Sequence, residues 1–143
     1  MKKIIFSTLF VALIVSCNKD KKTTKQIEKN IIEGNWRITN FNDSGDNETS
    51  DFNNYIFTFS ESGSVSATNG SNTISGTWST NNSSSDDSNS NAHFVLNFAV
   101  AAEHPFEDLN DDWDITSESK SKIELNDVSG GNGGSDFLTF EKN

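Results

Sequence analysis

Between residues 34 and 143 the chain consists of short runs in which apolar and polar residues alternate. β-Branched and aromatic residues dominate these runs, and Gly, Asn, Asp and Ser separate them. Successive side chains of a β-strand point to opposite faces, so the alternation predicts strands with one buried face. No stretch after residue 33 has the period of a helix, so the predicted fold class is all-β. Strands are predicted over 34–41, 52–60, 64–69, 72–80, 92–99, 112–118, 121–127 and 136–142.

The connections between these runs favour antiparallel neighbours. Glu61-Ser62-Gly63 and Asn69-Gly70 are tight-turn sequences, and Ser117 to Ser121 makes another short turn. A meander of eight strands would leave two outer edges bare, and closure into a barrel removes both. We therefore expect an eight-stranded antiparallel up-and-down barrel, whose interior is filled by side chains or holds one small ligand. A two-sheet sandwich is the alternative.

The first 16 residues have the layout of a secretory signal peptide. Lys2 and Lys3 precede a largely apolar run over 4–15, which is shorter than the roughly 20 residues that span a bilayer core. Ile14-Val15-Ser16-Cys17 follows and resembles the lipobox of bacterial lipoproteins, in which the cysteine thiol receives diacylglycerol. Cys17 is the single cysteine of the chain, so disulfide bonds are excluded. The alternative is an ordinary signal peptide that precedes a free thiol.

Lipidation of Cys17 would place the protein at the cell envelope. The resemblance implies two or three acyl chains, which are enough for stable membrane anchoring, where one chain binds only marginally. The expected location is the outer membrane, on its periplasmic or its surface-exposed side. Residues 18–22 partly resemble the surface-export signal of Bacteroidetes lipoproteins, and a solvated linker explains them equally well.

Charge divides the mature chain into a basic tether and an acidic domain. The tether, residues 17–33, carries a net charge of +2, and residues 34–143 carry −14. This division suits a basic stalk beside anionic lipid headgroups. It excludes nucleic acid as a partner, because nucleic-acid binding depends on lysine and arginine neutralising phosphates. Ile27, Ile31 and Ile32 predict a short helical turn that caps the domain at the end of the tether.

The first predicted strand begins with Gly34-Asn35-Trp36, which resembles the glycine-x-tryptophan signature of the lipocalins. In that family the glycine permits the turn into the first strand, and the indole plugs the closed end of the barrel. The order of the later motifs resembles lipocalin-like domains of flavobacterial lipoproteins over residues 34–143. The resemblance implies a lipocalin-like barrel that binds a small apolar molecule. Lys142 stands where lipocalins usually carry an arginine that stacks on the tryptophan.

The aromatic residues have two interpretations. Trp36, Trp78 and Trp113 are the candidate ligand-binding residues, because aromatic side chains line apolar pockets. The same residues can instead form the core that a domain of this size needs. The core is the favoured interpretation for most aromatics, including six phenylalanines: Phe57, Phe59, Phe94, Phe98, Phe137 and Phe140.

The acidic segment over 107–114 offers several hard oxygen ligands, so Asp108, Asn110, Asp112 and Asp114 are candidate calcium ligands. The helix-loop-helix calcium pattern is not met, because Trp113 occupies its glycine position. A solvated acidic rim is the plainer interpretation, and no other metal or cofactor is expected.

Nothing in the sequence marks a catalytic site. The only histidines, His93 and His104, lack the spacing of paired metal ligands. The chain is therefore expected not to be an enzyme. The leading hypothesis is a lipid-anchored barrel that binds a small apolar ligand. The alternative is a structural or protein-interaction lipoprotein with a filled barrel and an unidentified protein partner.

Overall fold

A computed structural model describes residues 24–82, 92–128 and 134–143. The predicted signal peptide, Cys17, the candidate export signal, the Ser/Asn/Asp tract over 83–91 and the glycine-rich connection over 129–133 lie outside the described residues. No helix within the described ranges is long and apolar enough to cross a membrane. The elements are α1 Thr24–Ile32, β1 Asn35–Asp43, β2 Asp46–Asn47, the 3-10 turn η1 Thr49–Phe52, β3 Ile56–Phe59, β4 Ser64–Thr68, β5 Thr73–Asn82, β6 Ala92–Phe98, β7 Asp111–Glu118, β8 Lys122–Val128 and β9 Ser135–Lys142.

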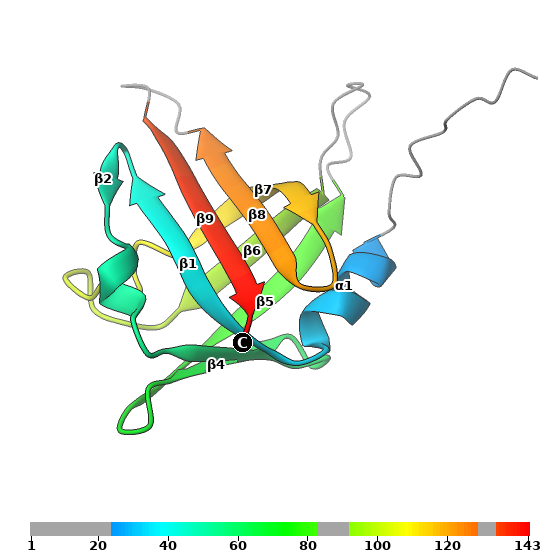
Figure 1. Ribbon diagram of the computed structural model, residues 1–143, viewed down its shortest axis with the longest axis horizontal. Coiled ribbons are helices and arrows are strands. Elements are labelled where there is room, and N and C mark those ends of the chain that lie inside the picture. The colour runs from blue at the N-terminus through cyan, green and yellow to red at the C-terminus, as the bar shows by residue number, and fades with distance from the viewer. Residues whose placement is uncertain (1–23, 83–91, 129–133) are drawn as a thin grey trace, which may run out of the picture.

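The strands form one antiparallel sheet that closes into a barrel (Figure 1). The order is β2-β1-β3-β4-β5-β6-β7-β8-β9, and a further pairing of β1 with β9 closes the ring. Strand β2 pairs only with the last two residues of β1, so the other eight strands make up the barrel. The predicted all-β class and eight-stranded meander barrel are confirmed, and the two-sheet sandwich is excluded.

The predicted strands match the observed ones closely except at the start of β3. Phe52 was expected to open that strand, but it ends η1, and β3 begins at Ile56. The Thr49 hydroxyl accepts a hydrogen bond from the Phe41 amide (2.8 Å) and donates one to the Phe41 carbonyl (3.2 Å), which holds η1 against β1. The Phe52 ring then packs edge-on against Phe41 (5.4 Å between centroids). Phe52 is thus a buried residue of a helical turn and not of a strand.

Aromatic side chains occupy the interior of the barrel. Phe57 of β3 contacts Phe98 of β6 (6.4 Å between ring centroids) and Phe140 of β9 (5.3 Å). Phe94 of β6 also contacts Phe140 (6.4 Å). These strands are not neighbours in the sheet, so the ring contacts run across the barrel. Phe137 is the exception among the six predicted core phenylalanines, since it faces outward with 47% of its surface exposed.

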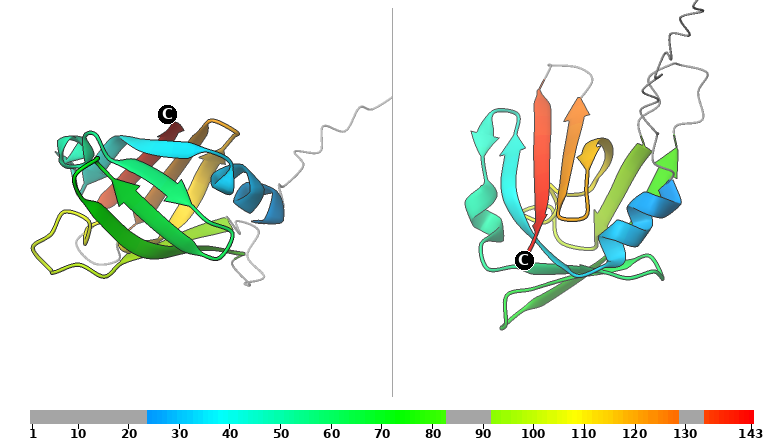
Figure 2. Two further views of the ribbon diagram at one scale, coloured as in Figure 1. Left: turned by 90° about the horizontal axis from the view of Figure 1, so that it is seen from below. Right: turned by 45° about the vertical axis from the view of Figure 1, so that its right-hand side comes forward.

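Helix α1 covers one end of the barrel, hereafter the α1 end, which also contains the start of β1, the β3–β4 and β7–β8 turns and the end of β9 (Figure 2). Ile27 and Ile31 are buried, as the predicted cap requires. The Trp36 indole donates a hydrogen bond to the Ile31 carbonyl (2.7 Å). Gly34 links the helix to β1 with a φ of +101°, a conformation that favours glycine. The α1 end is therefore sealed by the helix and by the tryptophan of the first strand.

The opposite end, hereafter the loop end, holds the β1–β2 turn, η1, the β4–β5 turn and the 99–110 loop. Phe106 and Leu109 from the 99–110 loop are buried, and Phe106 stacks on Phe57 (5.8 Å between centroids). The Asn110 side chain bonds both backbone groups of Phe98, and Trp113 donates to the Leu109 carbonyl (3.1 Å). This loop thus contributes to the core of the barrel.

Candidate functional site

The three candidate ligand-binding tryptophans lie in different surroundings. Trp36 and Trp113 are 0% and 1% exposed, and both indole N–H groups donate to backbone carbonyls. Their rings are core side chains of the barrel. Trp78 of β5 is 6% exposed and borders a groove at the outer surface. Of the three, only Trp78 is placed in this groove, so the structure does not bring them together in one pocket.

The groove lies between α1 and the wall formed by the β3–β4 turn and β5, and we call it the α1 groove. It encloses about 620 Å³. Ile32 and Trp78 contribute the apolar part of its surface. The lining residues are Lys25, Glu28, Lys29, Ile32, Glu61, Ser62, Gly63, Trp78 and Ser79.

Hydrogen bonds from the barrel fix both walls of the α1 groove. The Thr80 hydroxyl donates to the Glu28 carboxylate (2.6 Å), which ties α1 to β5. On the opposite wall, the Trp78 amide donates to the Gly63 carbonyl (2.9 Å) and the Trp78 indole donates to the Ser60 carbonyl (2.9 Å). The groove is therefore built into the fold, because its helix and its turn are each bonded to β5.

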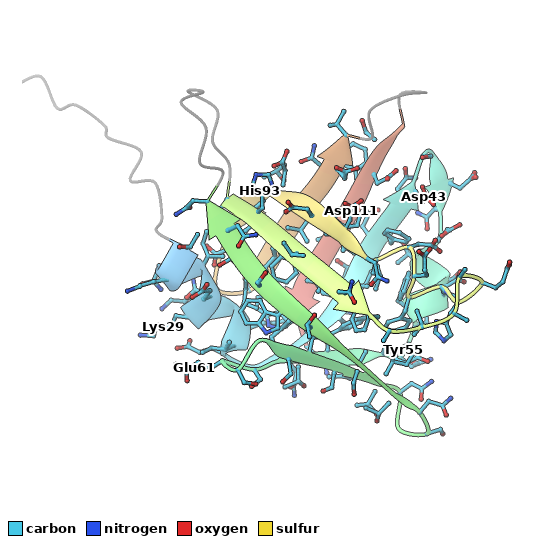
Figure 3. All side chains as sticks on the ribbon, turned by 180° about the vertical axis from the view of Figure 1, so that it is seen from behind. Lys29, Asp43, Tyr55, Glu61, His93 and Asp111 are labelled. Carbon is cyan, nitrogen blue, oxygen red and sulfur yellow. The ribbon has the colours of Figure 1, made fainter. Side chains whose placement is uncertain are left out.

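Charged side chains of both signs stand at the rim of the α1 groove. Lys25 and Lys29 are exposed and sit one helical turn apart, so they share a face of α1. Glu61 is exposed on the facing β3–β4 turn. Figure 3 shows Lys29 and Glu61 on the same side of the molecule, far from Asp43 at the loop end. The α1 wall carries Lys25, Lys29 and the Glu28 carboxylate that Thr80 binds. The facing turn carries Glu61, so the apolar floor lies beneath charges of both signs, a combination that suits an amphipathic molecule.

A second, polar pocket of about 400 Å³ opens at a break in the barrel wall. Strands β1 and β3 pair only through Asn35–Thr58 and Trp36–Phe57, so the wall is open beyond Trp36. Asn54 at this seam has a φ of +69°, a conformation that asparagine tolerates better than most residues. The lining residues are Arg37, Ile38, Phe52, Asn53, Asn54, Tyr55, Ile56 and Asn143.

The candidate calcium ligands are placed in different roles. The amide of Asn110 is bonded to the Phe98 backbone. Asp112 and Asp114 lie on the outer wall, where one oxygen of each is 3.3 and 3.4 Å from His93 Nδ1. Among the described residues, no group of three or more His, Cys, Asp or Glu side chains is arranged to hold a metal ion.

Basic side chains occur in only one half of the described barrel, where Glu28, Glu33, Glu61, Glu118, Glu124 and Glu141 also lie. Every lysine and arginine among the described residues lies in the α1-end half: Lys25, Lys29, Arg37, Lys120, Lys122 and Lys142. The turns and loops of the loop end carry Asp43, Asp46, Glu48, Asp51, Glu103, Glu107 and Asp108.

Crowding of carboxylates perturbs the acids at the loop end. Partial burial, followed by repulsion from Asp43 and Glu107, raises the pKa of Asp108. Partial burial and the nearby Asp108 likewise raise the pKa of Glu48. The pKa of Asp111, at the start of β7, is raised mainly by burial. Sequence reasoning found the acidic rim but could not find which acids share a neighbourhood, because they come from two stretches of the chain, 43–51 and 107–111, that are far apart in the sequence.

Comparisons with known proteins support the fold. A solved structure of a DUF4847 family protein from Bacteroides vulgatus superposes on this chain with a TM-score of 0.52 and 16% sequence identity. The match covers 82% of this chain and 97% of that protein. No family model matches the chain, and neither does any curated protein. The likeness establishes a shared barrel architecture.

Proposed function

We propose that this chain is a non-catalytic, lipid-anchored protein of the cell envelope, whose filled barrel presents binding surfaces on its outside. The observation that carries the proposal is the set of ring contacts across the interior, among Phe57, Phe98 and Phe140. An eight-stranded barrel has room for its own side chains or for one small ligand. With aromatic rings in contact across the middle, the interior is taken by the core.

The membrane anchor rests on Cys17, the single cysteine of the chain, which stands directly after an apolar run. Replacing Cys17 with alanine removes the thiol that would be acylated. We expect the Cys17→Ala protein to leave the membrane fraction or to accumulate uncleaved, while Ser16→Ala is processed as before. A Cys17→Ala protein that is correctly trimmed and still membrane-bound would contradict the anchor.

Mass spectrometry tests the filled interior. The protein is purified under native conditions, and its organic extract is compared with that of an unrelated lipoprotein prepared identically. An extract without a reproducible small apolar molecule is the expected result. A stoichiometric ligand that persists when the α1 groove is altered by Lys25→Ala and Lys29→Ala would place the ligand inside the barrel and refute the proposal.

A second candidate function is the binding of a small amphipathic ligand on the outer surface. The α1 groove favours it, because Trp78 and Ile32 supply an apolar floor beneath charged rims. In that case the co-purified ligand would be lost from the Lys25→Ala, Lys29→Ala protein and retained by a protein altered at Lys120.

A further inference from the structure

We infer that the α1 groove and the exposed face of α1 form a docking surface for phospholipid headgroups of the membrane that holds Cys17. This inference rests on the proposed lipid anchor and adds the orientation of the barrel and the class of its ligand. Three features carry it: the chemistry of the groove, the charge distribution of the barrel and the length of the tether.

The chemistry of the α1 groove matches a phospholipid at the level of the headgroup. Lys25 and Lys29 on one face of α1 offer two ammonium groups to a phosphate. Glu61 on the facing turn suits the ammonium of an ethanolamine headgroup. Beneath them, Ile32 and Trp78 form an apolar floor for the glycerol and the first methylenes of an acyl chain. Tryptophan at this level resembles the aromatic residues found at membrane interfaces.

The charge distribution of the barrel also favours an orientation with the α1 end toward the membrane. The six described lysines and arginines lie in the α1-end half and offset the six described glutamates there, whereas the turns and loops of the loop end carry seven carboxylates without one described basic residue. An anionic bilayer surface attracts basic groups and repels acidic ones within about a Debye length. A barrel anchored beside such a surface is therefore most stable with the α1 end toward the lipid.

The tether is short enough to keep the α1 groove close to the membrane. Six residues separate Cys17 from Thr24, the first residue of α1. Seven peptide steps span at most about 25 Å when fully extended. Three lysines, at positions 19, 21 and 22, stand in this segment and add to the attraction. The first turn of α1 thus lies within reach of the headgroups whenever Cys17 is inserted.

Vesicle binding by the unlipidated chain tests the docking surface. The chain from residue 17 onward, carrying Cys17→Ser, keeps the tether, α1 and the barrel but has no acyl chains. It is mixed with vesicles of phosphatidylethanolamine and phosphatidylglycerol whose acyl chains are brominated, and tryptophan fluorescence is recorded. We expect the quenching to come through Trp78, which borders the groove and is 6% exposed, whereas Trp36 and Trp113 are 0% and 1% exposed. Vesicles of phosphatidylcholine alone should quench less.

Two matched double variants separate the groove from general charge. Lys25→Ala with Lys29→Ala should lower the partition coefficient about 30-fold, the effect expected for two basic residues at an anionic surface. Arg37→Ala with Lys120→Ala removes the same charge from the same end outside the groove, and should lower it less than about threefold.

Absence of quenching in the unaltered chain, or equal losses in the two double variants, would overturn the docking surface. Neither result affects the Cys17→Ala fractionation or the search for a ligand inside the barrel, because those experiments do not depend on the groove. Failure of the inference is therefore distinguishable from failure of the proposed function.

Discussion

Gly76 leaves space in the barrel wall for the ring of Phe98. A Cβ atom at this position of β5 would lie 2.5 Å from the Asn97 carbonyl oxygen and 2.7 Å from a ring carbon of Phe98. Real Cβ atoms do not approach other atoms so closely, so an added methyl must displace β6 or the ring. The close packing of the interior at this point therefore requires glycine.

We predict that Gly76→Ala lowers the free energy of unfolding by about 1–3 kcal/mol, the usual cost of overpacking a core. Urea denaturation followed by tryptophan fluorescence measures the change. Ser75→Ala, at the exposed neighbouring position, serves as the control and should change stability by less than about 0.5 kcal/mol. A Gly76→Ala protein as stable as this control would show that β5 can shift to accommodate the added methyl group without loss of stability.

Lys142 of the last strand lies over the ring of Trp36 in the first strand. The Lys142 ammonium lies 5.2 Å from the centroid of Trp36. Lys142→Met keeps the apolar stem and removes the charge, so we expect a loss of about 0.5–1 kcal/mol from the cation–π contact. Lys142→Arg should retain stability. The contact contributes nothing if thermal unfolding of the Lys142→Met protein matches that of the unaltered chain.

At the level of secondary-structure elements, the buried side-chain amide of Asn30 attaches helix α1 to the barrel. Asn30 is 3% exposed, and its side-chain nitrogen donates a hydrogen bond to the Glu118 carboxylate of β7 (2.7 Å). The amide also accepts a bond from Gln26 (3.2 Å). A carboxylate in place of this amide cannot donate unless it is protonated, and it faces a like charge.

We predict that Asn30→Asp destabilises the protein by about 1–3 kcal/mol at neutral pH, the cost of an unsatisfied buried group. The loss should shrink near pH 4, because protonation of the new carboxyl restores a donor. Denaturation of the variant and the unaltered chain at both pH values makes the comparison. A penalty that does not change with pH would mean that the Asn30–Glu118 bond does not hold the helix.

A sequence predicts a secondary-structure element well when the buried residues of that element recur at a regular spacing. Strands such as β8, with Ile123 and Leu125 facing inward, were predictable because their alternation is regular. The 99–110 loop was not, since its buried side chains follow no period. Backbone hydrogen bonds within the loop close its turns, and the rings of η1 and β3 hold Phe106. Phe106, an isolated aromatic residue in an acidic segment, was the one available signal that this loop belongs to the core.

At the scale of the whole molecule, crowded acids make stability depend on pH. Partial burial raises the folded-state pKa values of Glu48, Asp108 and Asp111 above those of ordinary carboxyl groups. A carboxyl whose pKa is raised by folding binds its proton more tightly in the folded state. Stability therefore increases as the pH falls through the raised pKa values and is lost again as the pH rises through them. Glu124, whose pKa Lys122 lowers, opposes this only in more acidic solution.

Thermal unfolding should accordingly occur at a higher temperature at pH 5 than at pH 7. Asp108→Asn removes one of the repelling charges, so it should raise the unfolding temperature at pH 7 and reduce the difference between the two pH values. Glu103→Gln, an exposed change of equal charge on the same loop, should have a smaller effect. An unfolding temperature that is lower at pH 5 than at pH 7 would contradict the claim that repulsion between these carboxylates destabilises the fold.

Closure of the barrel was predictable from the sequence, whereas its filling was not. Eight alternating runs with short connections leave few ways to remove two sheet edges. The same aromatic residues, however, suit a lined pocket as well as a packed core, and only the positions of Phe57, Phe94 and Phe140 across the barrel decide between them. The α1 groove was hidden for a related reason, since it joins a tether helix to a turn about 30 residues later.

Xenon binding tests the filled barrel most directly, because xenon enters empty apolar cavities in protein interiors. A crystal of the protein would be pressurised with xenon, and anomalous difference density would be compared with that of an untreated crystal. We predict no xenon site among Phe57, Phe98, Phe106 and Phe140. A well-occupied xenon atom within that group of rings would show that the barrel contains a cavity, and would contradict the claim that its own side chains fill it.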